Sequence, residues 1–443
     1  MKVRVESTRT IKPIYEGIFP PLALHCIPLS VFDKVTYNTH IAVIYAYRPP
    51  MPTNAAIELG LQKALSEYRE WAGRLGEDEK GDPVIFLNDK GVKFVEASVD
   101  CKLDQLMPLK PSPVLLRLHP SLKDVEELVQ VQLTRFTCGS LVVGFTSHHS
   151  VADGHSTSNF LVAWGKASRC LDMSPLPLHD RTIFNPRKPP NFEFEHRGAE
   201  FKSKKLLKDY PNNYADSFVD DIVVHKVHFT LDFLSKLKAR ASPPSNNGNN
   251  LQNKPYSTFE SLVAHLWRAI TKARGLSGFE TTHVRISVNG RMRMSPRVPT
   301  EYFGNLVLWA FPSARVKDLL REPLPYAAKL IHEAIAKVND SYFKSFIDFA
   351  THKAEKEEDL VPTAEMNKSV LCPNLEVDSW LRFPFYDLDF GGGSPYIFTP
   401  SYFPTEGMMF LLPSFIGDGS IDAFIPLFQD NLATLKEIIY SLD

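Results

Sequence analysis

The sequence predicts an α/β (α+β) protein built from two mixed-sheet domains, and three observations support this prediction. The chain has 443 residues, whereas a single hydrophobic core usually stops growing at roughly 250 to 300 residues. Hydrophobic residues make up 44% of the chain and charged residues 23%, a composition typical of folded globular proteins. Strand-like and helix-like segments follow one another in both halves, so each half is expected to form its own sheet and helices.

The N-terminal half has a clear order of elements. Residues 1–13 alternate charged and apolar side chains, as an edge strand does, and residues 40–47 have the apolar run of a buried strand. Apolar residues recur at helical spacing over residues 54–73 and 158–171. Further strands are expected at residues 82–89, 92–99 and 140–147.

The C-terminal half begins with a helix. Ser257 and Glu260 have the spacing of a capping box, and Gly275 marks the end of the helical pattern. Later strands are expected at residues 283–290, 306–314, 407–415 and 420–427, and helices near residues 325–350 and 427–440.

Two breaks in the pattern suggest the domain limits. Proline-rich and charged residues from residue 174 onward favour a crossover between domains. We therefore expect an N-terminal domain at 1–185, a crossover loop at 186–222 and a C-terminal domain at 223–443. Residues 241–255 are too polar to pack and predict a mobile surface loop.

Charge and cysteine content argue against several classes of partner. The formal net charge is -1, which provides no general attraction to nucleic acid or an anionic membrane. The five cysteines include no CxxC pair, so neither a disulfide framework nor a thiolate zinc site is indicated. No apolar run reaches 18 residues, and the first residues lack the apolar stretch of a secretory signal. We expect a cytoplasmic protein that binds neither nucleic acid nor a membrane.

Residues 146–156, "TSHHSVADGHS", concentrate histidines and an acid at the end of a predicted strand. A metal site is not favoured, because adjacent His148 and His149 point to opposite faces of an extended segment and no HExxH pattern is present. A structural role or a catalytic base is compatible with the pattern, since histidine titrates near neutral pH. Gly154, next to Asp153, would permit the backbone angles of a tight turn.

Four short motifs resemble those of the BAHD family of plant acyl-CoA-dependent acyltransferases. "HHSVADG" resembles the family's HxxxD motif, with His149 and Asp153 at its ends. "NGR" at residues 289–291 and "YFGN" at residues 302–305 fall where family sequences have them. The fourth motif resembles DFGWG, with a glycine in place of its tryptophan, and consists of Asp389, Phe390, Gly391, Gly392 and Gly393.

The resemblance implies two domains of similar fold around a channel, with acyl-CoA as co-substrate and no permanently bound cofactor or metal. His149 would be the general base that deprotonates the acceptor. Asp153 would be structural and would pair with an arginine, for which Arg291 is our candidate. The alternative for Arg291 is an exposed surface residue. The protein is expected to act as a monomer.

One segment has two interpretations in this comparison. The backbone amides of Ser257 and Thr258 resemble the segment with which the family contacts CoA. The alternative is that they serve only to cap the helix that begins there.

The nature of the acceptor is suggested by "LCPNLEVDSW". Family members that acylate shikimate or quinate have an arginine where this chain has Leu371, and neutral residues in place of Glu376 and Asp378. Loss of a cation and gain of two acids favour a cationic acceptor. The segment resembles amine N-hydroxycinnamoyltransferases, particularly those acting on agmatine, with putrescine, tyramine and tryptamine as other acceptors. The alternatives are an O-acyltransferase that forms hydroxycinnamate esters and, for the two acids, a role as turn caps facing water.

Overall fold

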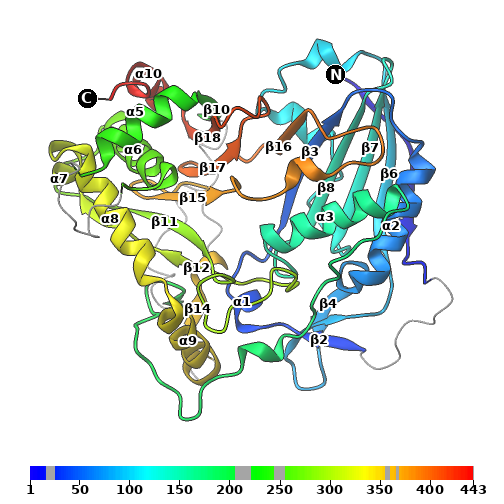
Figure 1. Ribbon diagram of the computed structural model, residues 1–443, viewed down its shortest axis with the longest axis horizontal. Coiled ribbons are helices and arrows are strands. Elements are labelled where there is room, and N and C mark those ends of the chain that lie inside the picture. Colours follow the sequence, from blue (N-terminus) through cyan, green and yellow to red (C-terminus); the bar gives the residue numbers. More distant parts are fainter. Residues whose placement is uncertain (16–24, 205–220, 244–254, 355–359, 366–368, 443) are drawn as a thin grey trace.

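The computed structural model describes residues 1–15, 25–204, 221–243, 255–354, 360–365 and 369–442. Within these residues the chain forms two halves that lie side by side (Figure 1). N-terminal segments form the half on the right of the view, and most of the later segments form the half on the left.

The N-terminal half is built on a six-stranded sheet. β6 and β7 run parallel, and the other neighbouring strands run antiparallel. The spatial order is β1 (Val3–Ile11), β6 (Val92–Val99), β7 (Val129–Phe136), β8 (Leu141–His148), β3 (His40–Tyr47) and β16 (Ile397–Pro400). Helices α2 (Asn54–Glu67) and α3 (Gly154–Ser168) contact each other and cover one face of the sheet (Figure 1).

The C-terminal half is built on a seven-stranded sheet. Its main path runs in the order β10 (Ile222–Phe229), β18 (Ile421–Phe428), β17 (Met408–Pro413), β15 (Leu375–Ser379), β11 (Thr281–Asn289) and β12 (Val307–Ala310), and β13 (Ser313–Arg315) also pairs with β11. β15 is parallel to both of its neighbours. The helices of this half are α5 (Leu231–Ala241), α6 (Thr258–Ala273), α7 (Val316–Arg321), α8 (Leu324–Lys337), α9 (Asp340–Phe349) and α10 (Gln429–Ile438).

Smaller elements complete the two halves. A three-stranded sheet is formed by β2 (Cys26–Pro28), β5 (Pro83–Phe86) and β4 (Arg74–Glu77), and the short helix α1 (Val31–Lys34) follows β2. β9 (Phe201–Ser203), in the predicted crossover, pairs with β14 (Leu360–Pro362). Within the described residues, no helix is both long and apolar enough to cross a lipid bilayer.

Most predicted elements of the chain are confirmed. The strand expected at residues 40–47 has those bounds, and the edge strand at the N-terminus is β1, which ends its sheet. The sequence did not predict the helices α1, α5 and α7, nor the strands β2, β4, β7, β9, β10, β14, β15 and β16. β7 was missed although its apolar and polar residues alternate as in a strand, and its two glutamines are buried with their side-chain amides donating hydrogen bonds. Most of the loop predicted at residues 241–255 lies outside the described residues.

The two sheets are not made from separate parts of the chain. β16 lies between β15 and β17 in the sequence, yet it pairs with β3 at the edge of the N-terminal sheet. One continuous core cluster contains residues from both halves, among them Tyr47, Trp164, Phe398 and Phe424. The predicted domain limits therefore remain a proposal, namely an N-terminal domain at 1–185, a crossover loop at 186–222 and a C-terminal domain at 223–443. The pairing of β16 with β3 shows that a strand from the C-terminal range completes the first sheet.

The loop that leads into β16 is the glycine-rich motif at residues 389–393. Asp389 accepts hydrogen bonds from the N–H groups of Gly391 and Gly393, at 2.7 and 2.9 Å. Both glycines have positive φ angles, 108° and 95°, which other residues adopt only with strain. Phe390 packs against Trp164 of α3, with ring centroids 4.8 Å apart. The motif thus anchors the segment that precedes β16 to the N-terminal half.

Gly392 has ordinary φ, and a lack of space explains the glycine there. A Cβ atom at this position would lie 2.5 Å from the Met51 sulfur and 2.5 Å from the Pro50 carbonyl oxygen. Met51 therefore takes the space beside residue 392, where the resembling motif has tryptophan.

We predict that Gly392→Ala lowers the free energy of unfolding by about 1–3 kcal/mol, because the added methyl group overlaps its neighbours. Urea unfolding monitored by fluorescence measures this loss. In a Met51→Ala background the same substitution should cost less, since the sulfur contact is gone. Equal stability of Gly392→Ala and the parent chain would contradict this packing.

Candidate functional site

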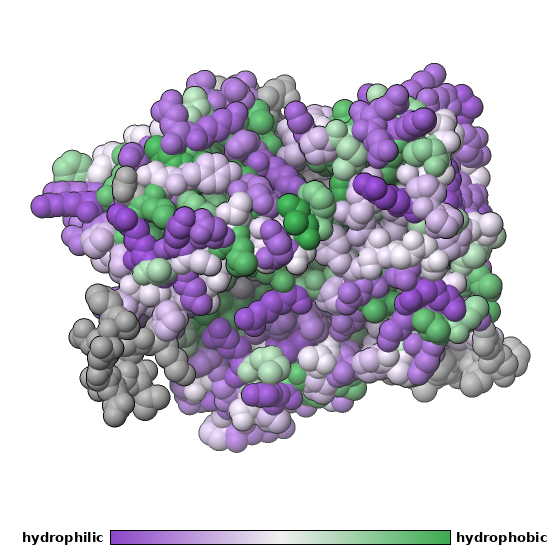
Figure 2. All heavy atoms as spheres, turned by 45° about the horizontal axis from the view of Figure 1, so that its top comes forward, coloured by the Kyte–Doolittle hydropathy of each residue, from purple (hydrophilic) through white to green (hydrophobic). Residues whose placement is uncertain are grey.

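A cavity of about 750 Å³ lies between the two halves. Strands β3 and β8 of the first sheet line it on one side, and β11, β12, β15 and β17 of the second sheet line the other. Residues 197–199 and 202 of the crossover form a further part of its wall. Figure 2 shows a largely hydrophilic surface that is hollowed near its middle.

Strand alternation decides which side chains reach the cavity. In β11, Val284 and Ile286 enter the core beneath α6, whereas Arg285 and Ser287 face the cavity. In β15, Val377 is in the core. Glu376 and Asp378 are among the residues that line the cavity. The second sheet therefore presents a charged face to the first sheet.

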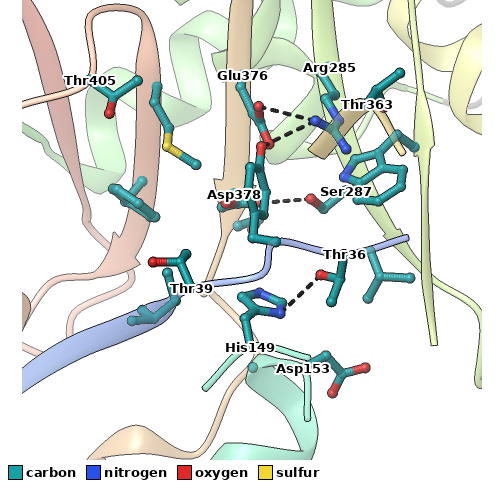
Figure 3. Close-up of a pocket in the computed structure, with 18 of the residues that line it drawn as sticks. Thr36, Thr39, His149, Asp153, Arg285, Ser287, Thr363, Glu376, Asp378 and Thr405 are labelled. Atoms are coloured by element: carbon teal, nitrogen blue, oxygen red, sulfur yellow. Dashed lines mark hydrogen bonds and ion pairs between the residues drawn. The ribbon is translucent and has the colours of Figure 1, made fainter. Parts of the chain in front are cut away.

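His149 directly follows β8 and reaches the cavity from the first sheet (Figure 3). Its backbone N–H donates to the Thr39 carbonyl oxygen at 2.9 Å, and its own carbonyl oxygen accepts from Asn305 Nδ2 at 2.9 Å. Its Nδ1 lies 3.0 Å from Thr36 Oγ1. In the tautomer that donates from Nδ1 to Thr36, the Nε2 lone pair can accept a proton. Burial lowers the pKa of His149, which favours the neutral ring.

The two neighbouring histidines have other surroundings. His148 packs edge-to-face against His40 with ring centroids 4.8 Å apart, and burial together with His40 lowers the pKa of His148 to about 3. His155 Nε2 lies 2.9 Å from the Thr300 carbonyl oxygen. In the part of the chain that the structure describes, no group of three histidine, cysteine or acidic residues is placed to hold a metal ion.

Asp153 fixes the loop that carries His149. It caps α3 by accepting a hydrogen bond from the Ser156 N–H at 2.9 Å, and it accepts another from the Leu306 N–H at 3.0 Å. Arg291 forms an ion pair with it at 2.7 Å and is only 1% exposed. The expected pair is therefore present, and the alternative of a surface arginine is wrong. Burial opposes ionisation of Asp153, but Arg291 outweighs it and lowers the pKa.

Gly154 was predicted to permit the backbone angles of a tight turn, and this explanation for the glycine is wrong. This residue is the first of helix α3 and is not among the glycines with positive φ. A Cβ atom here would lie 2.7 Å from a ring carbon of Phe383. Glycine is needed for close packing at this position, not for a special backbone angle.

Glu376 is held by two partners from other strands and loops. Tyr37 donates its hydroxyl to Glu376 Oε1 at 2.5 Å, and Arg285 Nη1 lies 3.7 Å from Oε2. Arg285 also donates to the Tyr37 hydroxyl oxygen at 3.1 Å and lies over the Trp309 ring, 3.8 Å from its centroid. Burial raises the pKa of Glu376, and the charge of Arg285 opposes this rise.

Asp378 lies two residues further along β15. Its Oδ1 accepts a hydrogen bond from Ser287 Oγ at 2.6 Å. Ser287 is the single hydrogen-bond partner of the Asp378 carboxylate among the described residues. Burial raises the pKa of this carboxyl as well. Since both acids line the cavity from a strand, the alternative of turn caps facing water is wrong. Leu371 lines the same cavity and adds no charge to it.

Ser257 and Thr258 lie at the start of α6, and neither is among the residues that line the cavity. The Ser257 hydroxyl oxygen accepts from the Glu260 N–H at 3.2 Å, and the Ser257 N–H donates to Glu260 Oε2 at 2.7 Å. The predicted capping box is therefore present. A contact of this segment with CoA remains a proposal.

Sequence reasoning missed four residues that shape the site, namely Thr36, Tyr37, Arg285 and Trp309. A usable signal existed for Arg285. In "HVRISVN" polar and apolar residues alternate as they do in "LEVDS", so both segments have one charged face. No comparable pattern marks Thr36 and Tyr37, which come from an irregular segment before β3.

The arrangement can perform base catalysis beside a site for a cation. A neutral imidazole from one sheet and two carboxylates from the other share one cavity. In Figure 3, His149 lies at one end of the view and Glu376 with Arg285 at the other, with Asp378 and Ser287 between them.

The chain is similar to known proteins over its whole length. The model of the Transferase family matches residues 1–442. Agmatine hydroxycinnamoyltransferase 1 of Oryza sativa subsp. japonica is 51% identical, covering 100% of this chain and 99% of that protein. Agmatine coumaroyltransferase-1 of Hordeum vulgare and putrescine hydroxycinnamoyltransferase 3 of Oryza sativa subsp. japonica are each 52% identical, with 100% of both chains covered. Shikimate O-hydroxycinnamoyltransferase of Nicotiana tabacum is 33% identical over 99% of this chain and 100% of that one.

Solved structures share the fold at lower identity. The crystal structure of vinorine synthase superimposes with a TM-score of 0.70 at 22% identity, covering 98% of this chain and 96% of the other. TRI101 of F. sporotrichioides, complexed with coenzyme A and T-2, gives a TM-score of 0.71 at 18% identity, covering 93% and 97%. The expected fold class, two mixed-sheet domains of this acyltransferase type, is confirmed.

We predict that Arg291→Met lowers the free energy of unfolding by about 3–5 kcal/mol, because it leaves the buried Asp153 carboxylate without its charged partner. Chemical denaturation measures the loss. Arg169→Met is the matched control, since Arg169 pairs with Asp389 at 3.0 Å with both side chains partly exposed. This control should cost no more than about 1 kcal/mol. Small and equal losses in both variants would contradict the role given to Arg291.

Proposed function

This chain belongs to the Transferase (BAHD) family of acyl-CoA-dependent acyltransferases, and we propose that it transfers a hydroxycinnamoyl group from its CoA thioester to the amine of a cationic acceptor such as agmatine or putrescine. The observation that carries this proposal is the shared cavity, in which a half-buried neutral histidine faces two carboxylates. The product is a hydroxycinnamic acid amide.

In the proposed reaction His149 is the general base. The amine nitrogen attacks the thioester carbonyl carbon, and Nε2 of His149 takes the proton that the nitrogen loses. The tetrahedral intermediate then collapses, the carbon–sulfur bond breaks, and the CoA thiolate leaves and recovers the proton from His149. Asp153 and Arg291 hold the loop of the base in place through their ion pair and the cap of α3.

The charge of the cavity supports an amine that carries a further positive group. An alkyl amine has a pKa near 10 and must lose its proton before it attacks. A guanidinium or second ammonium at the other end keeps its charge and can bind a carboxylate. Glu376 and Asp378 supply carboxylates, and Leu371 removes the cation expected for a carboxylate-bearing acceptor such as shikimate. The agmatine and putrescine transferases are also much more similar to this chain than the shikimate transferase is.

The working unit that we propose is a single chain with acyl-CoA as co-substrate. One chain supplies both walls of the cavity, and a structure of related fold was solved with coenzyme A. The N-terminus of α6, at Ser257 and Thr258, is our candidate for a contact with the phosphates of CoA, because helix N-termini attract anions.

Acceptor competition tests the proposal. Purified protein with coumaroyl-CoA is expected to acylate agmatine or putrescine with a kcat/KM at least about a hundredfold above that for shikimate, because shikimate brings a carboxylate to the two acids of β15. Chromatography of the amide and ester products measures both rates. His149→Ala should lower the amine rate by about 10²–10⁴-fold. Turnover of shikimate alone would refute the amine assignment in favour of an O-acyltransferase.

Thr36→Val tests how the base is oriented. The substitution is nearly isosteric and removes the hydroxyl that lies 3.0 Å from His149 Nδ1, so kcat should fall about tenfold while KM for coumaroyl-CoA stays unchanged. Thr36→Ser keeps a hydroxyl and should retain most of the rate. If the valine and serine variants have the same kcat, Thr36 does not orient the base.

A further inference from the structure

Glu376 and Asp378 have the same charge and face the same cavity, but their partners differ. Glu376 is 4% exposed and is engaged by both Tyr37 and Arg285. Asp378 accepts one neutral hydrogen bond from Ser287, and no ion pair joins it to a described residue. One acid of the cavity therefore has a resident cation and the other does not.

The register of the sheet explains this pairing. β11 and β15 run parallel with Arg285 directly opposite Glu376, so the two side chains leave neighbouring strands at the same level and on the same face. Asp378 lies two residues further along, beside the short Ser287 side chain. Backbone geometry alone thus brings the arginine to the first acid.

The guanidinium of Arg285 cannot leave this place easily. It stacks on Trp309, lies 5.4 Å from the Tyr37 ring centroid, and is 9% exposed. Its Nε and Nη2 are buried and have no hydrogen-bond partner within the described residues. A buried guanidinium retains its proton under all ordinary conditions, so it contributes a fixed positive charge that some carboxylate in the cavity must balance.

We infer that Arg285 and Glu376 form an internal neutral pair, which leaves Asp378 as the carboxylate of β15 that has no paired cation among the described residues and as the direct ligand of the acceptor's remote cation. This inference rests on the proposed amine acylation and refines it. Glu376 then acts on the acceptor through Arg285, as a positioning residue. The proposed acceptors carry one positive group beyond the reacting nitrogen, which matches the one unpaired carboxylate of β15.

The test is a charge-rescue experiment on the full chain. Glu376→Gln leaves Arg285 without its counter-ion, so the positive charge that stays in place is expected to offset the negative charge of Asp378. The kcat/KM for agmatine should then fall at least about tenfold, since one unit charge is added near a cationic ligand. The neutral-ended control pentylamine should lose far less. Adding Arg285→Gln to this variant restores the net charge and should recover most of the activity with agmatine.

The double variant decides between the two roles of Glu376. If Glu376 itself binds the acceptor cation, the double variant stays as poor with agmatine as the single one, and the inference fails. Recovery of the activity with agmatine in the double variant supports the inference. The KM for coumaroyl-CoA and the unfolding temperature are measured for each variant to show that it is folded. Asp378→Asn provides a second arm, in which agmatine should lose its advantage over pentylamine. A retained advantage would also overturn the inference.

The inference and the proposed function fail in different ways. If the parent chain acylates no amine, the proposed function is wrong, whatever the variants do. If the parent chain acylates agmatine and the double variant does not recover, only the division of roles between Glu376 and Asp378 is wrong.

Discussion

The geometry of the site depends on buried carboxylates of the first half that bind donors of the second half. Asp153 binds Arg291, and Asp33 accepts hydrogen bonds from both the backbone N–H and the side-chain amide of Asn305, at 3.0 and 2.9 Å. The same amide donates to the carbonyl oxygen of His149. A buried carboxylate is costly without such partners. The loop of His149 is therefore stable in this conformation only when both halves are docked, and the base is assembled by the whole fold.

The two sheets divide the chemistry between them. His149 comes from the first sheet, whereas the acidic groups come from β15 in the middle of the second. This separation has a chemical consequence, because a carboxylate next to the reacting nitrogen would stabilise its unreactive ammonium form. Binding of the remote cation and removal of the proton can then proceed at different places in one cavity.

Much of this arrangement could be predicted from the sequence, since it depends on local patterns. Periodicity located most strands and helices, and short motifs identified His149, Asp153 and Arg291. The failures have non-local causes. The pairing of β16 with β3 joins segments about 350 residues apart, and no local pattern encodes it. Gly154 was assigned to a turn because its neighbour Phe383 lies far away in the sequence.

The acidic segment shows why residue identity alone gives an incomplete description of a site. Two carboxylates on one strand face repel each other, and burial adds to the cost of their charges. Arg285 reduces this cost through its charge, and the charge of Glu376 acts against burial and raises the pKa of Arg285. Without the arginine, the first acid would bind a proton more readily and the charge of the cavity would vary with pH. With it, Glu376 loses its proton more readily, so the attraction of this face of the cavity for a cation depends less on pH.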